Sequence, residues 1–375
     1  MKLFADKNNC CGCTACKNIC PKNAITMVED SEGFLYPQID KQLCIDCGLC
    51  KKVCAFQNGY DKNNVIKAYG LKHKNFETRF SSRSGGAFTL ISDYILEKGG
   101  TVYGAAFNTD FTVSHKRAET KAERDAFKGS KYVQSEQGDC FSNVKADLKA
   151  GRYVMYSGTS CQIAGLYGYL KTSKVDYTNL FTVDLVCHGV PSNKIWKEFL
   201  LNVQKKNKGS KITNAEFRDK TFGWNTHFES VWVDDKKVSS KTFSSLFYKD
   251  DIIRPSCFNC KFTNTNRPAD FTLADFWGID KQLPDFNDNK GVSLFLVSSQ
   301  KGMELFEQVK DGADCREVQI ENCTKANPNL RRQTVKPADR DVFWQTYYKK
   351  GFDKTLSIYN RKIFISKIKK KLLKK

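Results

Sequence analysis

A run of closely spaced cysteines that occurs twice near the N-terminus constrains this chain more than any other feature. Nine of the 16 cysteines lie in the first 60 residues. The first run has the spacing C-x2-C-x2-C-x3-C-P, and the second repeats the four cysteine positions without the proline. The cysteines concerned are Cys10, Cys13, Cys16 and Cys20 in the first run, and Cys44, Cys47, Cys50 and Cys54 in the second.

This spacing is typical of bacterial ferredoxins that hold two 4Fe-4S clusters, and it predicts a ferredoxin domain over residues 1–60. Because the fourth cysteine of each run reaches the other cluster, Cys10, Cys13, Cys16 and Cys54 form one expected ligand set. Cys44, Cys47, Cys50 and Cys20 form the other. A pair of zinc sites is the alternative, since zinc also binds CxxC pairs. Cys11 is left over and is interpreted as a small apolar residue.

Length and composition narrow the class of protein. The 375 residues are 40% hydrophobic, which is enough for a packed core. The N-terminus turns polar before a signal-peptide core, and no stretch approaches the ~20 apolar residues of a membrane span. We therefore expect a cytoplasmic protein whose cysteines bind metal rather than form disulfides. The net charge of +20 identifies no partner by itself, and in the absence of a recognition motif we expect no nucleic acid partner.

Beyond residue 65 the chain alternates short apolar runs with helical patterns, which predicts an α/β domain with a partly parallel sheet. The expected strands are 101–107, 153–156, 180–186, 212–217 and 228–233, and the expected helices are 86–98, 163–170 and 193–203. Residues 58–64 are polar and rich in turn formers, and they are the expected domain boundary.

Cysteine follows two of the expected parallel strands, Cys161 after the first and Cys187 after the second. Strand ends of this kind meet at one edge of a sheet, where ligands bind in open α/β folds. Cys257 and Cys260 add a CxxC pair, so four thiolates are available for a third 4Fe-4S cluster. By spacing alone, buried core cysteines, a redox dithiol or half a zinc site remain alternatives.

Several segments taken together resemble one family, the coenzyme F420 hydrogenase/dehydrogenase beta subunits, fused here to an N-terminal ferredoxin domain. The resemblance covers roughly residues 1–300, and Ser160 stands where many relatives have proline. The segments that carry it are residues 82–88, 129–135, 158–165, 186–191, 217–220, 254–260 and 270–278.

The resemblance implies an iron–sulfur flavoprotein that uses FAD, in which the Cys161, Cys187, Cys257 and Cys260 set holds a cluster beside the flavin. It also implies that two loops bind the flavin, namely Ser84-Gly85-Gly86 and Gly129-Ser130-Lys131-Tyr132. The residues are compatible with this role, because Gly85 and Gly86 open an expected helix whose N-terminus favours phosphate. Lys131 would add a cation and Tyr132 a ring surface. An ordinary glycine-rich turn is the alternative.

The expected fold class is therefore mixed α/β, with a small ferredoxin module (1–60), a larger domain that binds flavin and a 4Fe-4S cluster (61–345), and a basic tail (346–375). The expected function is electron transfer between one-electron clusters and a two-electron flavin or hydride acceptor. His188, beside Cys187, is the candidate proton donor, or else it stabilises its loop. The alternative function is a non-catalytic electron-transfer subunit of a larger redox complex.

The expected partner is a soluble redox partner (a ferredoxin, a deazaflavin or a nicotinamide coenzyme) or a partner subunit. Residues 361–375 contain eight cationic and no acidic residues. Their apolar positions fall near helical spacing, which predicts either a basic amphipathic helix in peripheral contact with a membrane or a solvated tail.

Overall fold

The fold is that of a computed structural model that describes residues 3–372, with side chains through residue 360. Its N-terminal module is built around a two-stranded antiparallel sheet, in which Ile25 lies opposite Ile39. A short helix follows each cysteine loop, because Thr14 and Gly48 adopt left-handed backbone conformations that turn the chain into the helix. The elements are α1 (Ala15–Asn18), β1 (Ile25–Glu29), β2 (Leu35–Ile39), α2 (Leu49–Lys52) and α3 (Ala55–Asn58).

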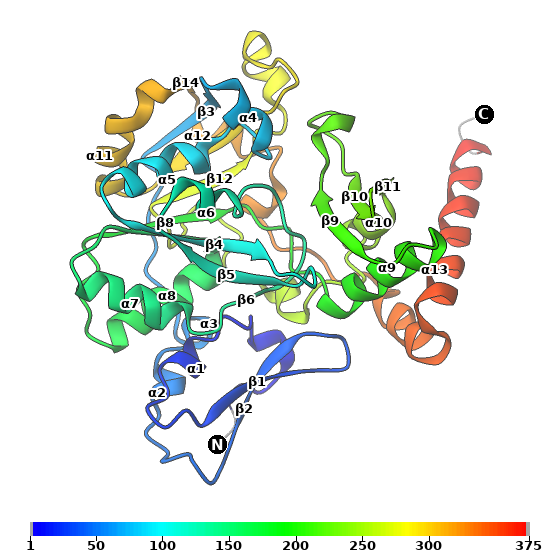
Figure 1. The fold of residues 1–375 in the computed structure, drawn as a ribbon, viewed down its shortest axis with the longest axis horizontal. Coiled ribbons are helices and arrows are strands. Elements are labelled where there is room, and N and C mark those ends of the chain that lie inside the picture. The colour runs from blue at the N-terminus through cyan, green and yellow to red at the C-terminus, as the bar shows by residue number, and fades with distance from the viewer. Residues whose placement is uncertain (1–2, 373–375) are drawn as a thin grey trace.

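A nine-stranded mixed sheet forms the centre of the larger domain (Figure 1). Neighbouring strands β4, β7, β8 and β12 run parallel, so their carboxyl ends meet at one edge, as the sequence predicted. In spatial order the strands are β14 (Ala313–Glu317), β3 (Lys67–His73), β13 (Ser293–Val297), β12 (Phe271–Asp275), β8 (Leu180–Leu185), β7 (Val154–Thr159), β4 (Thr101–Phe107), β5 (Val113–Ala118) and β6 (Ser135–Glu136).

Helices cover both faces of this sheet, which explains why the strands β7, β8 and β13 are buried along most of their length rather than at alternate residues. One face packs against α5 and α11 through a core that includes Ile91 and Phe306. The opposite face packs against α7 and α8 through a core that includes Phe141 and Leu166. The helices of this domain are α4 (Phe76–Ser81), α5 (Ala87–Glu97), α6 (Lys121–Asp125), α7 (Cys140–Lys149), α8 (Ser160–Thr172), α11 (Gln300–Val309) and α12 (Ile320–Cys323).

A second lobe, at the right of Figure 1, has a separate hydrophobic core around the fully buried Trp196. Its three-stranded antiparallel sheet has the order β11-β10-β9. The elements are α9 (Asn193–Lys206), β9 (Ile212–Phe217), β10 (Glu229–Val233), β11 (Lys236–Ser240), α10 (Thr242–Tyr248) and α13 (Arg340–Leu372).

The segment from residue 346 onward, expected as a tail, continues helix α13, which bends at Gly351. Tyr347, Phe352 and Leu356 are buried in the core of the second lobe, so this part of the segment is integral to the fold. The expectation of an amphipathic surface concerns the side chains of residues 361–375, which lie outside the described residues.

The N-terminal module rests on α8, where two glycines make room for it (Figure 1). A Cβ atom at Gly165 would lie 2.8 Å from Cys13 Sγ, and one at Gly168 would lie 2.5 Å from the carbonyl oxygen of Val53. Real Cβ contacts are never that short, so α8 needs glycine at these positions for the module to pack this closely.

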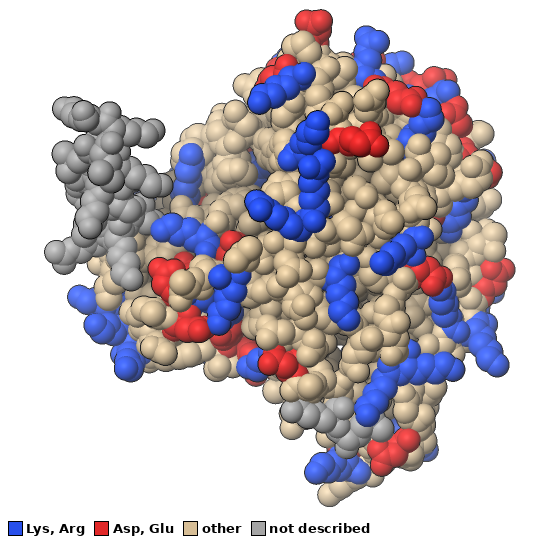
Figure 2. Space-filling view, turned by 180° about the vertical axis from the view of Figure 1, so that it is seen from behind, with Lys and Arg blue, Asp and Glu red and all other residues tan. Residues whose placement is uncertain are grey.

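Lys and Arg side chains are spread over the face seen in Figure 2, with Asp and Glu among them, rather than gathered in one patch. Within residues 3–372, no helix combines the length and the apolar character that a bilayer span requires.

Candidate functional site

The eight cysteines of the doubled run line two cavities in the N-terminal module. Cys10, Cys13, Cys16 and Cys54 line the first cavity, and Cys20, Cys44 and Cys47 line the second, while Cys50 contacts both. Each cavity therefore receives the last cysteine of the other run, which is the exchange expected for a two-cluster ferredoxin. Burial raises the pKa of Cys16 and of Cys54, and nearby thiols of the same set raise both further.

Four more thiols gather where the parallel strands end. Every one of the six pairs among Cys161, Cys187, Cys257 and Cys260 interacts electrostatically. Burial raises the pKa of Cys187 to about 12 and that of Cys260 to about 11, and the neighbouring thiols add to both shifts. Four buried thiols at this spacing are unfavourable as free thiolates, and bound iron would favour the thiolate form.

The thiols gather without converging on the position of a single ion. In a tetrahedral zinc site with Zn–S bonds of about 2.3 Å, sulfur atoms lie only about 3.8 Å apart. Over the described part of the chain, no three His, Cys, Asp or Glu side chains are arranged for one metal ion. In a four-iron cluster the cysteine ligands stand further apart than around one zinc ion, and the four-thiol set is a candidate for such a cluster.

Local sequence fixes Cys161 in the first turn of α8. Thr159 caps this helix, and the Gln162 side chain accepts a hydrogen bond of 2.9 Å from the Thr159 backbone N–H, which completes a capping box. The Cys161 thiol lies 3.1 Å from Thr159 Oγ1. The hydrogen bond with Cys11 and burial raise the pKa of Cys161, and the position near a helix N-terminus opposes that shift.

A buried ion pair connects the segments that carry these cysteines. The Arg267 guanidinium donates to Asp184 at 3.0 Å, and both side chains are at most 2% exposed. Ser160 Oγ also donates to Asp184 at 2.7 Å, and Arg267 donates to the carbonyl oxygen of Phe262 at 3.0 Å. Asp184 thus joins the end of β8, the start of α8 and the segment after Cys260.

Cys11 lies between the two modules. Its thiol contacts both Cys13 in the ferredoxin module and Cys161 in the larger domain. It also lines both the first ferredoxin cavity and the large cavity described below. The sequence interpretation of Cys11 as a small apolar residue missed this bridging place, because nothing in the spacing of the run links it to residue 161.

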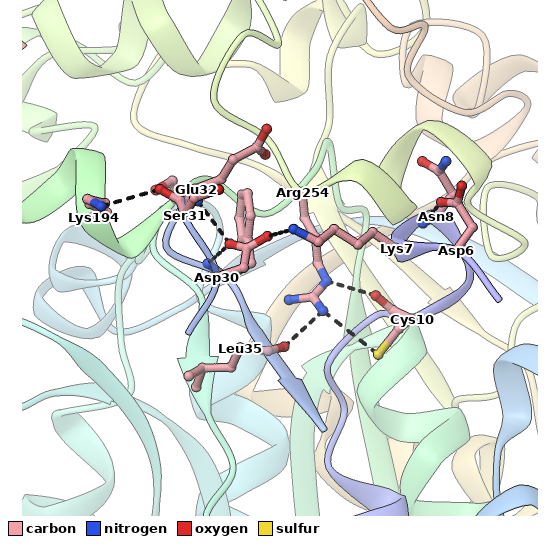
Figure 3. A network of polar contacts seen from close by, with 12 residues as sticks. Asp6, Lys7, Asn8, Cys10, Asp30, Ser31, Glu32, Leu35, Lys194 and Arg254 are labelled. Atoms are coloured by element: carbon pink, nitrogen blue, oxygen red, sulfur yellow. Dashed lines mark hydrogen bonds and ion pairs between the residues drawn. The ribbon is translucent and has the colours of Figure 1, made fainter. Parts of the chain in front are cut away.

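Arg254 makes several polar contacts between the modules (Figure 3). It precedes the turn Pro255–Asn259, is 1% exposed and reaches into the ferredoxin module. Its guanidinium donates to the carbonyl oxygens of Cys10 and Leu35, both at 2.9 Å, and to Cys10 Sγ at 3.8 Å. It also donates to Gln134 Oε1 at 3.0 Å and lies 4.2 Å from the ring centre of Tyr36.

A cavity of about 520 Å³ opens beside the four-thiol set, at the carboxyl ends of β7, β8 and β12. Cys161, Cys187 and His188 form part of its wall. The placement agrees with the rule that open α/β sheets bind ligands at the carboxyl edge of their parallel strands. The cavity is large enough and apolar enough to hold a planar cofactor.

The expected flavin loops lie at this cavity with one exception. Ser84, Gly86 and the whole segment 129–132 line it, whereas Gly85 does not. A Cβ atom on Gly85 would lie 1.9 Å from the carbonyl oxygen of Leu71. The backbone N–H of Gly85 donates to Ser293 Oγ at 2.9 Å. Gly85 therefore packs the loop against the sheet, and its N–H is not free for a phosphate.

Lys131 and Tyr132, the two other residues expected to contact the flavin, already form contacts with neighbouring residues of the protein. Lys131 Nζ donates to the carbonyl oxygens of Ala126 and Lys128 at 2.8 and 2.7 Å, and burial lowers the pKa of Lys131 to about 7. Tyr132 packs against Phe247 and accepts a 3.1 Å hydrogen bond from Tyr248. Tyr132 is thus one ring of an aromatic wall rather than an isolated platform.

His188 is oriented by a carboxylate. Its Nε2 lies 2.6 Å from Asp250 Oδ1, and its ring packs edge-on against Phe247. The side chain is 30% exposed and faces the cavity wall beside Cys187. A histidine held by a carboxylate next to a ligand cavity has the arrangement of a general acid or base.

Sequence reasoning missed the cavity residues Arg83, His115, Arg218 and His227, which come from four different elements or loops. His115 is buried, with Nδ1 2.6 Å from Ser135 Oγ and Nε2 2.9 Å from the carbonyl oxygen of Ser157. The segments that resemble the family include Arg83 and Arg218, but single cations carry no spacing that marks them as cavity residues. The remaining cysteines, Cys140, Cys315 and Cys323, lie in none of these sites.

Comparisons with known proteins agree with the two-module organisation. Residues 151–322 match the family model for the C-terminal part of the beta subunit of coenzyme F420 hydrogenase/dehydrogenase. Residues 9–58 match the family model for the 4Fe-4S dicluster domain. No curated protein matches the chain.

Among solved structures, one similar chain comes from an F420-reducing NiFe hydrogenase complex of Methanosarcina barkeri, studied by xenon derivatisation. It is 17% identical, with a TM-score of 0.49, and the match covers 80% of this chain and 94% of that one. The assignment rests on the two family models, which confirm the resemblance seen in the sequence and imply an iron–sulfur redox role. The chain therefore carries a 4Fe-4S dicluster domain at residues 9–58, and its residues 151–322 match the C-terminal domain of the coenzyme F420 hydrogenase/dehydrogenase beta subunit.

Proposed function

We propose that this protein is an iron–sulfur flavoprotein oxidoreductase that couples one-electron transfer through its N-terminal module to two-electron chemistry in the large cavity. Two 4Fe-4S clusters in the module would receive electrons, and a third would be held by Cys161, Cys187, Cys257 and Cys260. The observation that carries the proposal is that all six pairs of these thiols are coupled beside a cavity at the sheet edge.

The protein supplies a short, buried route between the proposed cluster sites. Cys11 contacts Cys13 on one side and Cys161 on the other, and Arg254 reaches from the Cys257 turn to Cys10. The two glycines of α8 bring the module within van der Waals contact of the helix that begins at Cys161. These contacts pack the proposed cluster sites of the two modules against each other.

FAD is the proposed occupant of the cavity, where it would exchange two electrons as a hydride and pass single electrons to the adjacent cluster. The chain would enclose its ring with the aromatic wall of Tyr132, Tyr248 and Trp277. Ser84, Gly86 and the segment Gly129–Tyr132 would line the phosphate end of the flavin. A soluble coenzyme or organic substrate is the proposed second reactant.

His188 is the proposed proton donor of this reaction. Asp250 fixes the orientation of the imidazole ring at the cavity wall, as general acid–base catalysis requires. We expect His188→Gln to reduce turnover with an artificial electron donor by about 100-fold or more, while the iron and flavin contents stay unchanged. Unchanged turnover would assign the histidine a purely structural role in its loop.

Cofactor analysis of the anaerobically purified chain tests the proposal. We expect about twelve irons and one flavin per chain, from three four-iron clusters. Cys260→Ser should lower the iron content to about eight, while the matched control Cys315→Ser, in β14 and outside all three sites, should retain about twelve. Eight irons and no flavin in the wild type would contradict the proposal.

Turnover by the isolated chain separates this proposal from a non-catalytic electron-transfer subunit. With an artificial one-electron donor, the proposed enzyme would reduce a two-electron acceptor without any partner protein. A chain that contains all the cofactors but turns over only when a second subunit is added would be the electron-transfer subunit instead.

A further inference from the structure

One end of the large cavity carries nitrogen atoms that have no hydrogen-bond partner. They are Arg83 Nε and Nη2, Arg218 Nε and His227 Nδ1, all buried and without a partner among residues 3–360. All three side chains line the same cavity, and His227 interacts electrostatically with both arginines. A buried donor without an acceptor costs about 1–3 kcal/mol, so several of them at one place indicate that a ligand completes the site.

The charge at this end of the cavity is positive. Arg218 forms an ion pair with Asp275, whereas Arg83 donates only a 3.3 Å hydrogen bond to the carbonyl oxygen of Phe217. Burial lowers the pKa of Arg83 to about 10, and repulsion by Arg218 adds to the shift. Among the described residues, Asp275 is the carboxylate in an ion pair with these guanidinium groups, and Glu216 also interacts with Arg83 without forming an ion pair. The nitrogens without a partner therefore leave the geometry to bind an anion.

The loop that carries Arg83 is held in place by the half-buried Lys220. Lys220 Nζ donates to the carbonyl oxygens of Arg79, Ser82 and Ser84 at 2.8, 2.9 and 3.2 Å. Ser84 Oγ also donates to the carbonyl oxygen of Val292 at 2.8 Å. The backbone on both sides of Arg83 is thus fixed before a ligand arrives, which lowers the entropy cost of binding.

Aromatic rings surround the unpartnered nitrogens. Trp277 lies 5.2 Å from the Arg218 guanidinium and stacks on Trp224 at 5.4 Å. His227 lies between Trp277 and Tyr248, with ring centres 6.3 and 4.5 Å away. Burial lowers the pKa of His227 to about 4, so the ring is neutral at pH 7 and adds no charge. This wall suits a flat group attached to the anion.

We propose that Arg83, Arg218 and His227 form a subsite for the carboxylate or phosphate group of a ligand that carries a planar ring. The inference deepens the proposed function, on which it rests, because it defines one end of the same cavity. Two ligands could present this chemistry, namely the phosphate of the flavin itself or an acidic organic substrate that exchanges electrons with it.

Equilibrium binding to the full chain tests the subsite. FAD, FMN and riboflavin are titrated by flavin fluorescence, and inorganic phosphate and benzoate by calorimetry, on wild type, Arg83→Gln and Arg83→Lys. Arg152→Gln is the matched control, since Arg152 lies outside the cavity and also has a partnerless Nε atom. Thermal unfolding of each variant shows whether it is folded. Arg83→Lys retains the positive charge but lacks the planar guanidinium group.

Either of two results supports the proposal. If the anion is the flavin phosphate, Arg83→Gln weakens FAD and FMN binding about 10- to 100-fold and leaves riboflavin unchanged. If the anion belongs to a substrate, all three flavins bind as in the wild type, and phosphate or benzoate binding weakens by the same factor. Arg83→Lys should show an intermediate loss in either case.

The proposal is overturned if Arg83→Gln binds all three flavins and both anions as tightly as the wild type and Arg152→Gln do. Failure of the wild type to bind any flavin would contradict the proposed function alone, because phosphate and benzoate still report on Arg83 in that case.

Discussion

At the scale of single residues, Arg254 shows how the two modules depend on each other. It is 1% exposed, yet its hydrogen-bond acceptors are oxygens of neutral groups and the sulfur of Cys10, with no carboxylate among them. A buried cation without a counter-charge is costly. A four-iron cluster with cysteinate ligands carries a net charge of about −2 and would supply that counter-charge through Cys10.

Arg254 should therefore raise the reduction potential of the cluster that Cys10 is proposed to ligate, because a cation and a hydrogen bond to sulfur both favour the more negative, reduced form. We expect Arg254→Gln to lower the midpoint potential by about 60–130 mV, the equivalent of about 1.5–3 kcal/mol for one electron. EPR-monitored redox titration measures this change. The midpoint potential of Arg254→Lys should lie between those of the wild type and Arg254→Gln. Identical potentials in all three proteins would contradict the proposed effect of Arg254 on this cluster.

His115 should make stability depend on pH. Burial lowers its pKa from an ordinary value near 6.5 to about 4. Between these values the unfolded chain binds a proton that the folded chain does not, so stability falls as the pH drops from 6.5 towards 4. We expect a contribution of about 2 kcal/mol to the loss of unfolding free energy between pH 7 and pH 5. Urea unfolding at pH 7 and at pH 5 measures the change in unfolding free energy, and His115→Gln should remove the contribution of His115.

Spacing in the sequence was sufficient to propose all twelve ligand cysteines, because closely spaced thiols and cysteines at strand ends carry local signals. Arg254 had no such signal. Its acceptors Cys10 and Leu35 lie 244 and 219 positions away, and only the folded chain brings them together. Cys11 packs against an apolar cluster, in agreement with its interpretation as a small apolar residue, but its contact with Cys161 of the other module carried no local signal.

At the scale of elements, the strands and helices with strong local patterns were predicted well. The strand at 101–107 is β4 with identical bounds, and the helix at 86–98 is α5 (Ala87–Glu97). The strands β3 and β14 were missed because polar residues interrupt their apolar pattern. Their antiparallel pairing with each other and with β13 joins distant segments, which local periodicity does not reveal.

Helix α8 should be sensitive to a single methyl group. At Gly168 a Cβ atom would lie 2.5 Å from the carbonyl oxygen of Val53, so Gly168→Ala should push the N-terminal module away. Overpacking of this kind costs about 1–3 kcal/mol. Thermal unfolding and the rate of proteolysis between residues 58 and 64 measure the effect. Thr172→Ala, at the end of the same helix, is the control, and equal behaviour of the two variants would show that the module does not rest on Gly168.

At the scale of the whole molecule, the two modules share their apolar contacts. Ala15 and Val53 of the N-terminal module belong to the core formed by α7 and α8. Phe56 packs against Phe262 with ring centres 6.2 Å apart, and Tyr60 stacks on Phe262 at 4.6 Å. The module is thus part of one cooperative structure rather than a domain on a flexible linker.

Calorimetry should therefore show a single unfolding transition for the intact protein. Phe262 is 3% exposed, and Phe262→Ala should cost about 3–5 kcal/mol and separate the unfolding of the N-terminal module from that of the larger domain. Two transitions in the wild type would contradict the shared core. Phe80→Ala, at an exposed phenylalanine of α4, is the control and should leave the unfolding profile unchanged.

The turn from Arg254 to Cys260 has a consequence for how such a protein can change over generations. One stretch of seven residues supplies both the guanidinium that enters the N-terminal module and two thiols of the four-thiol set. Recombination that exchanged the N-terminal module for an unrelated electron carrier would leave the buried Arg254 guanidinium without its hydrogen-bond acceptors in that module. We therefore expect the N-terminal module and the larger domain to be inherited together. Natural substitutions at Arg254 should be accompanied by substitutions near Cys10 and Leu35.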